Sequence, residues 1–130
     1  MSWKDSLSVD IVSIDREHRA LAEGIDAFFT RLRAGTDRQT MVAGLDGLVN
    51  AVADHFDHEE RVMRNIALPD YPVHRQLHAA LLEEIRLFRE EVRLGTNDRP
   101  AEVIEHFLHG WLFKHIAAED QKIGDHLNRG

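Results

Sequence analysis

The stretch His74-Arg75-Gln76-Leu77-His78 places two histidines four positions apart. In an α-helix this spacing puts both imidazoles on one face, about one turn apart, so both can reach the same metal ion. Neutral imidazole is the commonest metal ligand among protein side chains. From this pair alone two interpretations stay open: metal ligands, or core histidines whose nitrogens are satisfied by hydrogen bonds.

The sequence around the pair predicts a helix over residues 71–94. Asp70 or Tyr71 can cap its start, Pro72 suits its first turn, and Gly95 suits the position after its end. The predicted inward face also carries four apolar residues in line with the two histidines: Leu81, Ile85, Phe88 and Val92. Both histidines therefore occupy positions where a bundle would otherwise place core leucines.

Three further segments show the same helical period of apolar residues, over residues of about 14–35, 38–66 and 99–127. Ser13 is a plausible N-cap for the first of these helices and Asp37 for the second. The connections between the segments are short. Four helices with apolar faces and short connections predict an all-α fold, an up-down-up-down antiparallel four-helix bundle.

Residues 1–12 have no helical period but contain apolar side chains such as Trp3 and Leu7. We expect them to form an N-terminal arm that packs against the helices. A chain of 130 residues is long enough to bury a genuine core. We see no repeat or second hydrophobic unit, so residues 1–130 are predicted to form one domain.

The composition excludes several classes of protein. A net charge of −7 argues against non-specific nucleic-acid binding, which needs a basic surface. The absence of cysteine excludes thiolate metal sites, iron–sulfur clusters and disulfides. No apolar run is as long as a membrane span and the N-terminus lacks a signal-peptide pattern, so the default expectation is a cytoplasmic protein. Nine histidines in such a chain are the unusual feature.

Polar residues interrupt the predicted apolar faces at one end of the bundle, where the starts of the first and third helices meet the ends of the second and fourth. Five histidines and two carboxylates fall in one core layer: His18, His55, Glu59, His74, His78, His115, and Glu119 or Asp120. Unpaired buried ions would cost several kcal/mol each. A pair of divalent metals would satisfy the layer, and its ligands suit iron, with manganese or zinc chemically possible.

The second carboxylate of this layer cannot be chosen from regular helix geometry alone. Glu119 lies four residues after His115 and shares its face, whereas Asp120 is rotated by about 140°. A one-residue π-bulge between His115 and Asp120 would re-aim the aspartate, and such bulges occur at functional sites. The two residues remain alternatives at this point.

Sequence motifs along nearly the whole chain resemble those of a single-domain bacterial hemerythrin. The matching pieces are Ile14-Asp15-Arg16-Glu17-His18, His55-Phe56-Asp57-His58-Glu59-Glu60 with Met63, Tyr71-Pro72-Val73-His74 with His78, and Trp111-Leu112-Phe113-Lys114-His115-Ile116 with Asp120. In the hemerythrin pattern the final carboxylate follows the last histidine by five residues. The resemblance therefore favours Asp120 over Glu119.

The resemblance implies a non-heme diiron centre. It assigns His74, His78 and His115 to one iron, His18 and His55 to the other, and Glu59 and Asp120 as bridges together with a solvent-derived oxo or hydroxo group. The two-histidine iron would keep an open position for dioxygen. Trp111, Leu112 and Ile116 would wall an apolar oxygen pocket beside it.

The implied function is reversible dioxygen binding, in an oxygen carrier, storage or delivery protein rather than an enzyme. The alternatives are an oxygen or redox sensor that acts through a protein partner, and a diiron oxidase or peroxidase. Four histidines have no place in this pattern and are predicted to lie on the surface: His58, His106, His109 and His126. Glu60 is predicted to be solvated or to stand behind the ligands. The oligomeric state stays open.

Overall fold

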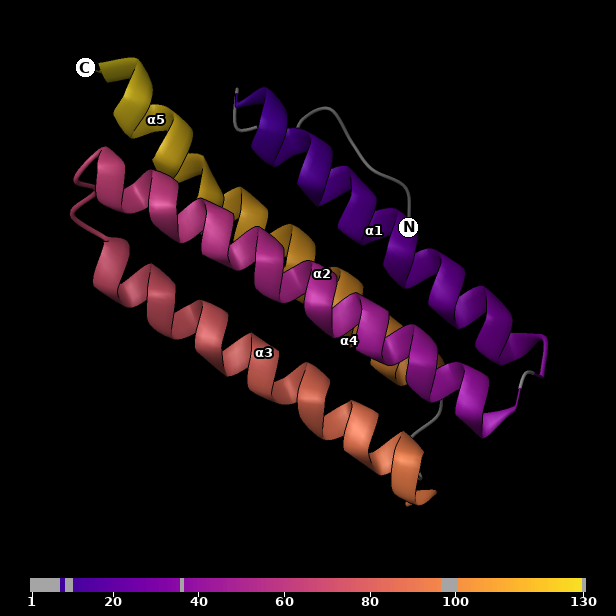
Figure 1. The fold of residues 1–130 in the computed structure, drawn as a ribbon. Helices are drawn as coiled ribbons and strands as arrows, with labels where there is room; N and C mark the ends of the chain where they lie inside the picture. The colour runs from indigo at the N-terminus through magenta and orange to yellow at the C-terminus, as the bar shows by residue number, and fades with distance from the viewer. Residues whose placement is uncertain (1–7, 9–10, 36, 97–100, 130) are drawn as a thin grey trace.

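A computed structural model describes residue 8 and residues 11–35, 37–96 and 101–129. Its elements are α1 (Val12–Arg33), α2 (Arg38–Asn65), α3 (Tyr71–Leu94) and a last helical run of α4 (Ala101–His115), η2 (Ile116–Asp120) and α5 (Gln121–Arg129). Consecutive helices run in opposite directions, which confirms the predicted antiparallel four-helix bundle (Figure 1). The predicted arm lies mostly outside the described residues. No described helix is long and apolar enough to cross a membrane.

The helix ends follow local side-chain chemistry, with one difference from the prediction. Asp37 caps α2 by accepting a hydrogen bond of 2.7 Å from the backbone N–H of Thr40, as its position suggested. Gly95 ends α3 with a φ of 72°, a left-handed conformation that glycine adopts without strain. Ser13, however, is not the cap of α1, because the helix already begins at Val12 after an extended Ile11 whose carbonyl accepts the first helical bond.

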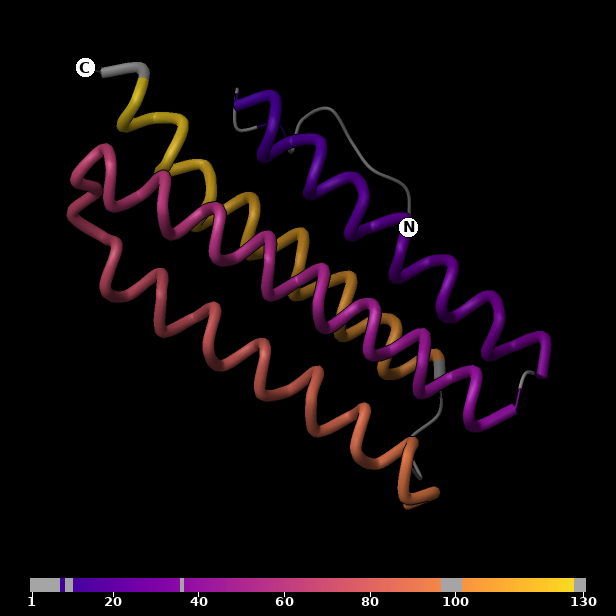
Figure 2. The backbone as a smooth tube through the Cα atoms, viewed as in Figure 1, coloured from indigo at the N-terminus to yellow at the C-terminus, as the bar shows by residue number. Residues whose placement is uncertain are grey.

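The apolar faces of the helices meet in a core that divides into two parts. The larger part includes an aromatic cluster in which the Phe28 and Phe29 ring centroids lie 5.0 Å apart and the Phe88 ring stacks on Phe29 at 6.4 Å. A smaller cluster of Met63, Leu68 and Ile123 closes the other end of the bundle. Figure 2 shows that the start of α1, the end of α2, the start of α3 and α5 share this second end. A buried polar layer between the two clusters is therefore shielded by apolar side chains on both sides.

Candidate metal centre

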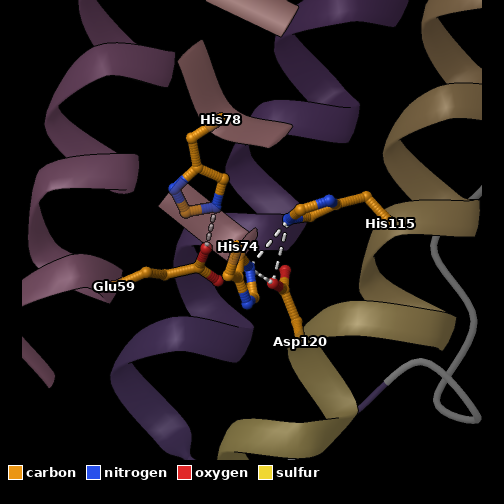
Figure 3. Close-up of side chains that lie close together, drawn as sticks. All are labelled: Glu59, His74, His78, His115 and Asp120. Carbon is orange, nitrogen blue, oxygen red and sulfur yellow. Dashed lines mark hydrogen bonds and ion pairs between the residues drawn. The ribbon is translucent and has the colours of Figure 1, made fainter. Parts of the chain in front are cut away.

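The seven residues predicted to form the polar layer converge in the core, five of them visible in Figure 3. All four helical runs contribute: His18 from α1, His55 and Glu59 from α2, His74 and His78 from α3, and His115 and Asp120 from the last run. His115 is the most exposed of the seven, at 6%. Burial of two carboxylates in a core requires compensating positive charge nearby.

A π-helical turn explains which acidic residue enters the layer. Residues Ile116–Asp120 form π-helix, whose bonds run from i to i+5, so the fifth residue after His115 returns to its side of the helix. Asp120 is 1% exposed and approaches His115, whereas Glu119 faces outward and pairs with Lys122 at 3.1 Å. Regular α-helix geometry, which favoured Glu119, therefore does not apply at this turn.

The Glu59 carboxylate stands between two groups of histidines. Its Oε1 lies 3.1 Å from Nε2 of His78 on one side. Its Oε2 lies 3.0 Å from Nε2 of His18 and 3.2 Å from Nε2 of His55 on the other. Each carboxylate oxygen thus faces a different histidine group, which is the arrangement of a bridging ligand.

Asp120 divides its two oxygens in the same way. Its Oδ1 lies 2.7 Å from Nε2 of His74 and 3.1 Å from Nε2 of His115. Its Oδ2 lies 2.9 Å from Nε2 of His18. Both carboxylates therefore contact both groups of histidines. One group contains His74, His78 and His115, and the other contains His18 and His55.

Two pairs of atoms in the layer form hydrogen bonds with each other, His18 with Glu59 and His74 with His115, but several others do not. Within the described residues, Nε2 of His55 and His78, Oε1 of Glu59 and both oxygens of Asp120 are buried and make no well-formed hydrogen bond, although partners lie near 3 Å. Ligands at right angles around an ion with bonds of about 2.1 Å stand about 3 Å apart. The arrangement thus fits two adjacent metal ions, each within reach of one histidine group and both carboxylates.

The electrostatics of the layer also favour positive charge. Burial opposes ionisation of Glu59, but contacts with histidines hold its pKa well below its ordinary value. Burial and the charge of Glu59 both act to raise the pKa of Asp120, yet close contacts with His115, His18 and His74 lower it to about 2. Burial acts to lower the pKa of His18, but Asp120 and Glu59 raise it to about 9. Both carboxylates are therefore ionised at neutral pH, and the layer favours a positive charge beside them.

Two carboxylates behind the layer orient the ligand histidines. Nδ1 of His55 donates to Oε1 of Glu17 at 2.6 Å, and Nδ1 of His78 donates to Oε2 of Glu60 at 3.1 Å. Such contacts fix the tautomer and direct Nε2 toward the metal. Glu17 also accepts a 2.9 Å hydrogen bond from His58. Glu60 was predicted to be solvated or to stand behind the ligands, and its contact with His78 supports the second role. The role of Glu17 was not predicted, because its only signal was its position before His18 in the matching motif.

Aromatic rings stack on two histidines of the layer, His78 and His115. The Phe56 ring stacks on His78 with centroids 3.8 Å apart and an interplanar angle of 1°. Trp111 stacks on His115 at 4.9 Å and 11°. These contacts restrict rotation of both imidazoles, so the three-histidine group is ordered by packing as well as by hydrogen bonds.

An apolar cavity of about 10 Å³ lies one helical turn from the metal layer. Each helix gives its wall a residue three positions from a layer histidine: Leu21, Val52, Leu81 and Leu112. Trp111 also lines the cavity, whereas Ile116 is buried in the same core but does not line it. An apolar cavity of this size lacks the polar partners that an ordered water needs.

The histidines outside the layer differ from one another. His106 is exposed, as predicted, and His58 is 26% exposed while bound to Glu17. His126 is half-buried and donates to the carbonyl of Ile66 at 2.9 Å. The prediction of a surface position was wrong for His109, which is 2% exposed because its ring lies between α1 and α4.

A four-helix bundle whose core holds two histidine groups joined by two shared carboxylates defines a class of two-metal proteins. Residues 9–127 match the family described as the hemerythrin HHE cation binding domain. The chain therefore belongs to the hemerythrin family, whose domain binds a diiron centre.

Known relatives and solved structures agree with this assignment. The chain is 28% identical to a bacteriohemerythrin of Stenotrophomonas maltophilia, over 98% of this chain and 84% of the relative. It is 27% identical to a myohemerythrin of Riftia pachyptila, over 96% of this chain and 92% of the relative. A crystal structure of wild-type hemerythrin superposes with a TM-score of 0.87 at 22% identity, covering 98% of this chain and 97% of that chain.

Proposed function

We propose that this protein binds dioxygen reversibly at its diiron centre and serves in oxygen carriage, storage or delivery. The observation that carries the proposal is the inequality of the two ligand sets. One set offers five side-chain ligands, Glu59, His74, His78, His115 and Asp120, and the other offers four, His18, His55, Glu59 and Asp120. If each group held one iron, the iron held by His18 and His55 would have one side-chain ligand fewer than the other, and dioxygen could bind on that side.

The residues around the layer suit a small, uncharged ligand. A diiron centre supplies two electrons to dioxygen and recovers them on release. Leu112 and Trp111 line the adjacent cavity, whose nine lining residues are all apolar or aromatic. This lining excludes water and restricts proton delivery, which protects a reversible adduct. Its volume of about 10 Å³ leaves no room for an organic substrate.

A second candidate function, a diiron oxidase or peroxidase, is favoured by a different feature. A groove of about 780 Å³ between α1 and α2 reaches His55, Glu17 and His58 from the surface. Such a groove could admit a substrate near the two-histidine group without using the apolar cavity. The two functions therefore predict different fates for the oxygen that the centre takes up.

The deciding experiment is an absorption spectrum of the reduced, anaerobic, iron-loaded protein before air, after air and after flushing with argon. Reversible dioxygen binding predicts a visible charge-transfer band that appears in air and disappears under argon, with two irons per chain. Irreversible oxidation with release of hydrogen peroxide would favour the oxidase. No spectral change in protein that contains two irons would overturn both candidates.

A further inference from the structure

His109 belongs to a second cluster of ligand-type residues, outside the diiron layer. The ring of His109 is buried between α1 and α4, with Nε2 2.7 Å from Oδ1 of Asp26 and 4.0 Å from Oε2 of Glu105. One potential ligand atom from each of these three side chains lies within 4.8 Å of the other two. The cluster joins helices that are far apart in the sequence.

The geometry of this cluster repeats that of the diiron layer. Both ring nitrogens of His109 are buried and make no well-formed hydrogen bond within the described residues, although a carboxylate oxygen lies 2.7 Å from Nε2. The same combination marks His55 and His78, whose Nε2 atoms lie 3.2 and 3.1 Å from Glu59. In both places a buried imidazole nitrogen lies close to a carboxylate oxygen without the geometry of a hydrogen bond.

We propose that Asp26, Glu105 and His109 form a separate binding site for one divalent transition-metal ion, with zinc as the best fit. Imidazole nitrogen and carboxylate oxygen both bind zinc in proteins, and three protein ligands would leave a fourth position for water. Arg33 contacts Oε1 of Glu105, so Oε2 is the oxygen that faces His109.

The charge balance and access of the site also suit a divalent cation. Asp26 and Glu105 each carry a negative charge, Arg33 pairs with Glu105, and His109 would bind metal as the neutral ring. Asp26 is 41% exposed, which gives an ion a path from solvent. His109 precedes His115 by six residues, about 9 Å along the helix, so the site is separate from the diiron layer. A bound ion would tie α1 to α4 in the half of the bundle that contains no iron.

The test is equilibrium dialysis of the iron-loaded protein against zinc chloride, with iron and zinc counted together. We expect one zinc per chain in addition to the two irons, and an unchanged diiron absorption spectrum. Asp26→Asn and His109→Gln should each weaken zinc binding by about tenfold or more. His106→Gln, an exposed histidine on the same helix, is the matched control and should bind zinc as the wild type does.

Two further measurements distinguish zinc bound specifically by these three residues from zinc bound weakly elsewhere on the surface. Zinc should raise the melting temperature of the wild type and not that of Asp26→Asn, whose half-exposed position tolerates the change. The extended X-ray absorption fine structure of the bound zinc should show a single imidazole. Zinc that replaces iron, equal binding by wild type and Asp26→Asn, or no third ion would overturn the proposal. Because the readout is zinc, these outcomes are independent of whether the diiron centre binds dioxygen.

Discussion

Replacing Asp120 by asparagine tests the π-helical turn and the second bridge together. The substitution keeps the shape of the side chain but removes a charge held by three histidines at 2.7 to 3.1 Å. In the metal-free protein these contacts shift the pKa of Asp120 from 3.8 to about 2. At 1.36 kcal/mol per pKa unit, the shift corresponds to about 2 kcal/mol of folding free energy.

The pH dependence of this contribution has a definite sign. Because the folded-state pKa of Asp120 is depressed, its contribution is fully present above pH 3.8 and is lost as the pH falls through about 2. Urea unfolding of the metal-free proteins at pH 7 should show Asp120→Asn to be less stable than wild type by about 2 kcal/mol. The difference should shrink toward pH 2. The iron-loaded variant should hold fewer than two irons and lack the diiron spectrum.

Glu119→Gln is the matched control for this prediction. Glu119 is 22% exposed and pairs with Lys122 at the surface, a contact worth less than about 1 kcal/mol. This variant should keep two irons and the wild-type spectrum. Two irons in Asp120→Asn, or iron loss confined to Glu119→Gln, would refute the assignment of Asp120 as the bridge and the role given to the π-helical turn.

Three further predictions concern the layer, its cavity and its outer support. The pKa of His18 is raised from 6.5 to about 9. In urea unfolding, the metal-free protein should therefore lose about 3 kcal/mol of folding stability as the pH rises from 6.5 to 9. Over the same range its affinity for iron should rise, because iron must displace the proton of His18. Leu112→Ala should lower the free energy of unfolding by about 3 kcal/mol in the same assay. The variant should retain two irons and oxidise faster in air. An oxidation rate equal to that of the wild type would show that Leu112 does not protect the iron. Glu17→Gln should lower iron affinity about tenfold in a chelator competition by releasing Nδ1 of His55, whereas Asp57→Asn, on the exposed face, should not.

The bundle was predictable because each helix carries a regular apolar period and clear end signals. Asp37 and Gly95 mark ends that obey local rules and need no tertiary information. Ser13 misled because the choice between two neighbouring helix starts depends on how the preceding chain packs. Ile11 packs against the core and accepts the first helical bond, so the helix begins before the serine.

The metal layer was predictable in composition but not in detail. The spacing of His74 and His78 follows from regular helix geometry. The choice of Asp120 does not, because the π-helical turn alters the angular position of every residue after His115. The resemblance to hemerythrins pointed to Asp120, because the family pattern places the final carboxylate five residues after the last histidine. It gives no physical reason for that spacing.

His109 was misplaced for a related reason. A helix in a bundle buries a broad face, and His109 follows Leu108 at the edge of that face, where it meets α1. Its partner Asp26 lies on a different helix, and no local pattern joins the two residues. Glu17 was missed in the same way, because its role depends on a contact with His55 across the α1–α2 interface. Contacts between distant segments are the part of a site that periodicity cannot supply.

Side chains outside the layer fix the orientation of three of its histidines. Phe56 and Trp111 stack on ligand rings, and Glu17 and Glu60 hold two imidazoles, through contacts that involve no metal. Without iron, the ionised carboxylates retain a proton on His18, so the layer still contains opposite charges in hydrogen-bonding contact. The contacts of the four supporting side chains restrict the rotation of the imidazoles, so we expect them to raise the affinity of the layer for iron. The three-histidine group is held by ring stacking and by the hydrogen bond from His78 to Glu60, whereas His55 of the two-histidine group is held by its hydrogen bond to Glu17.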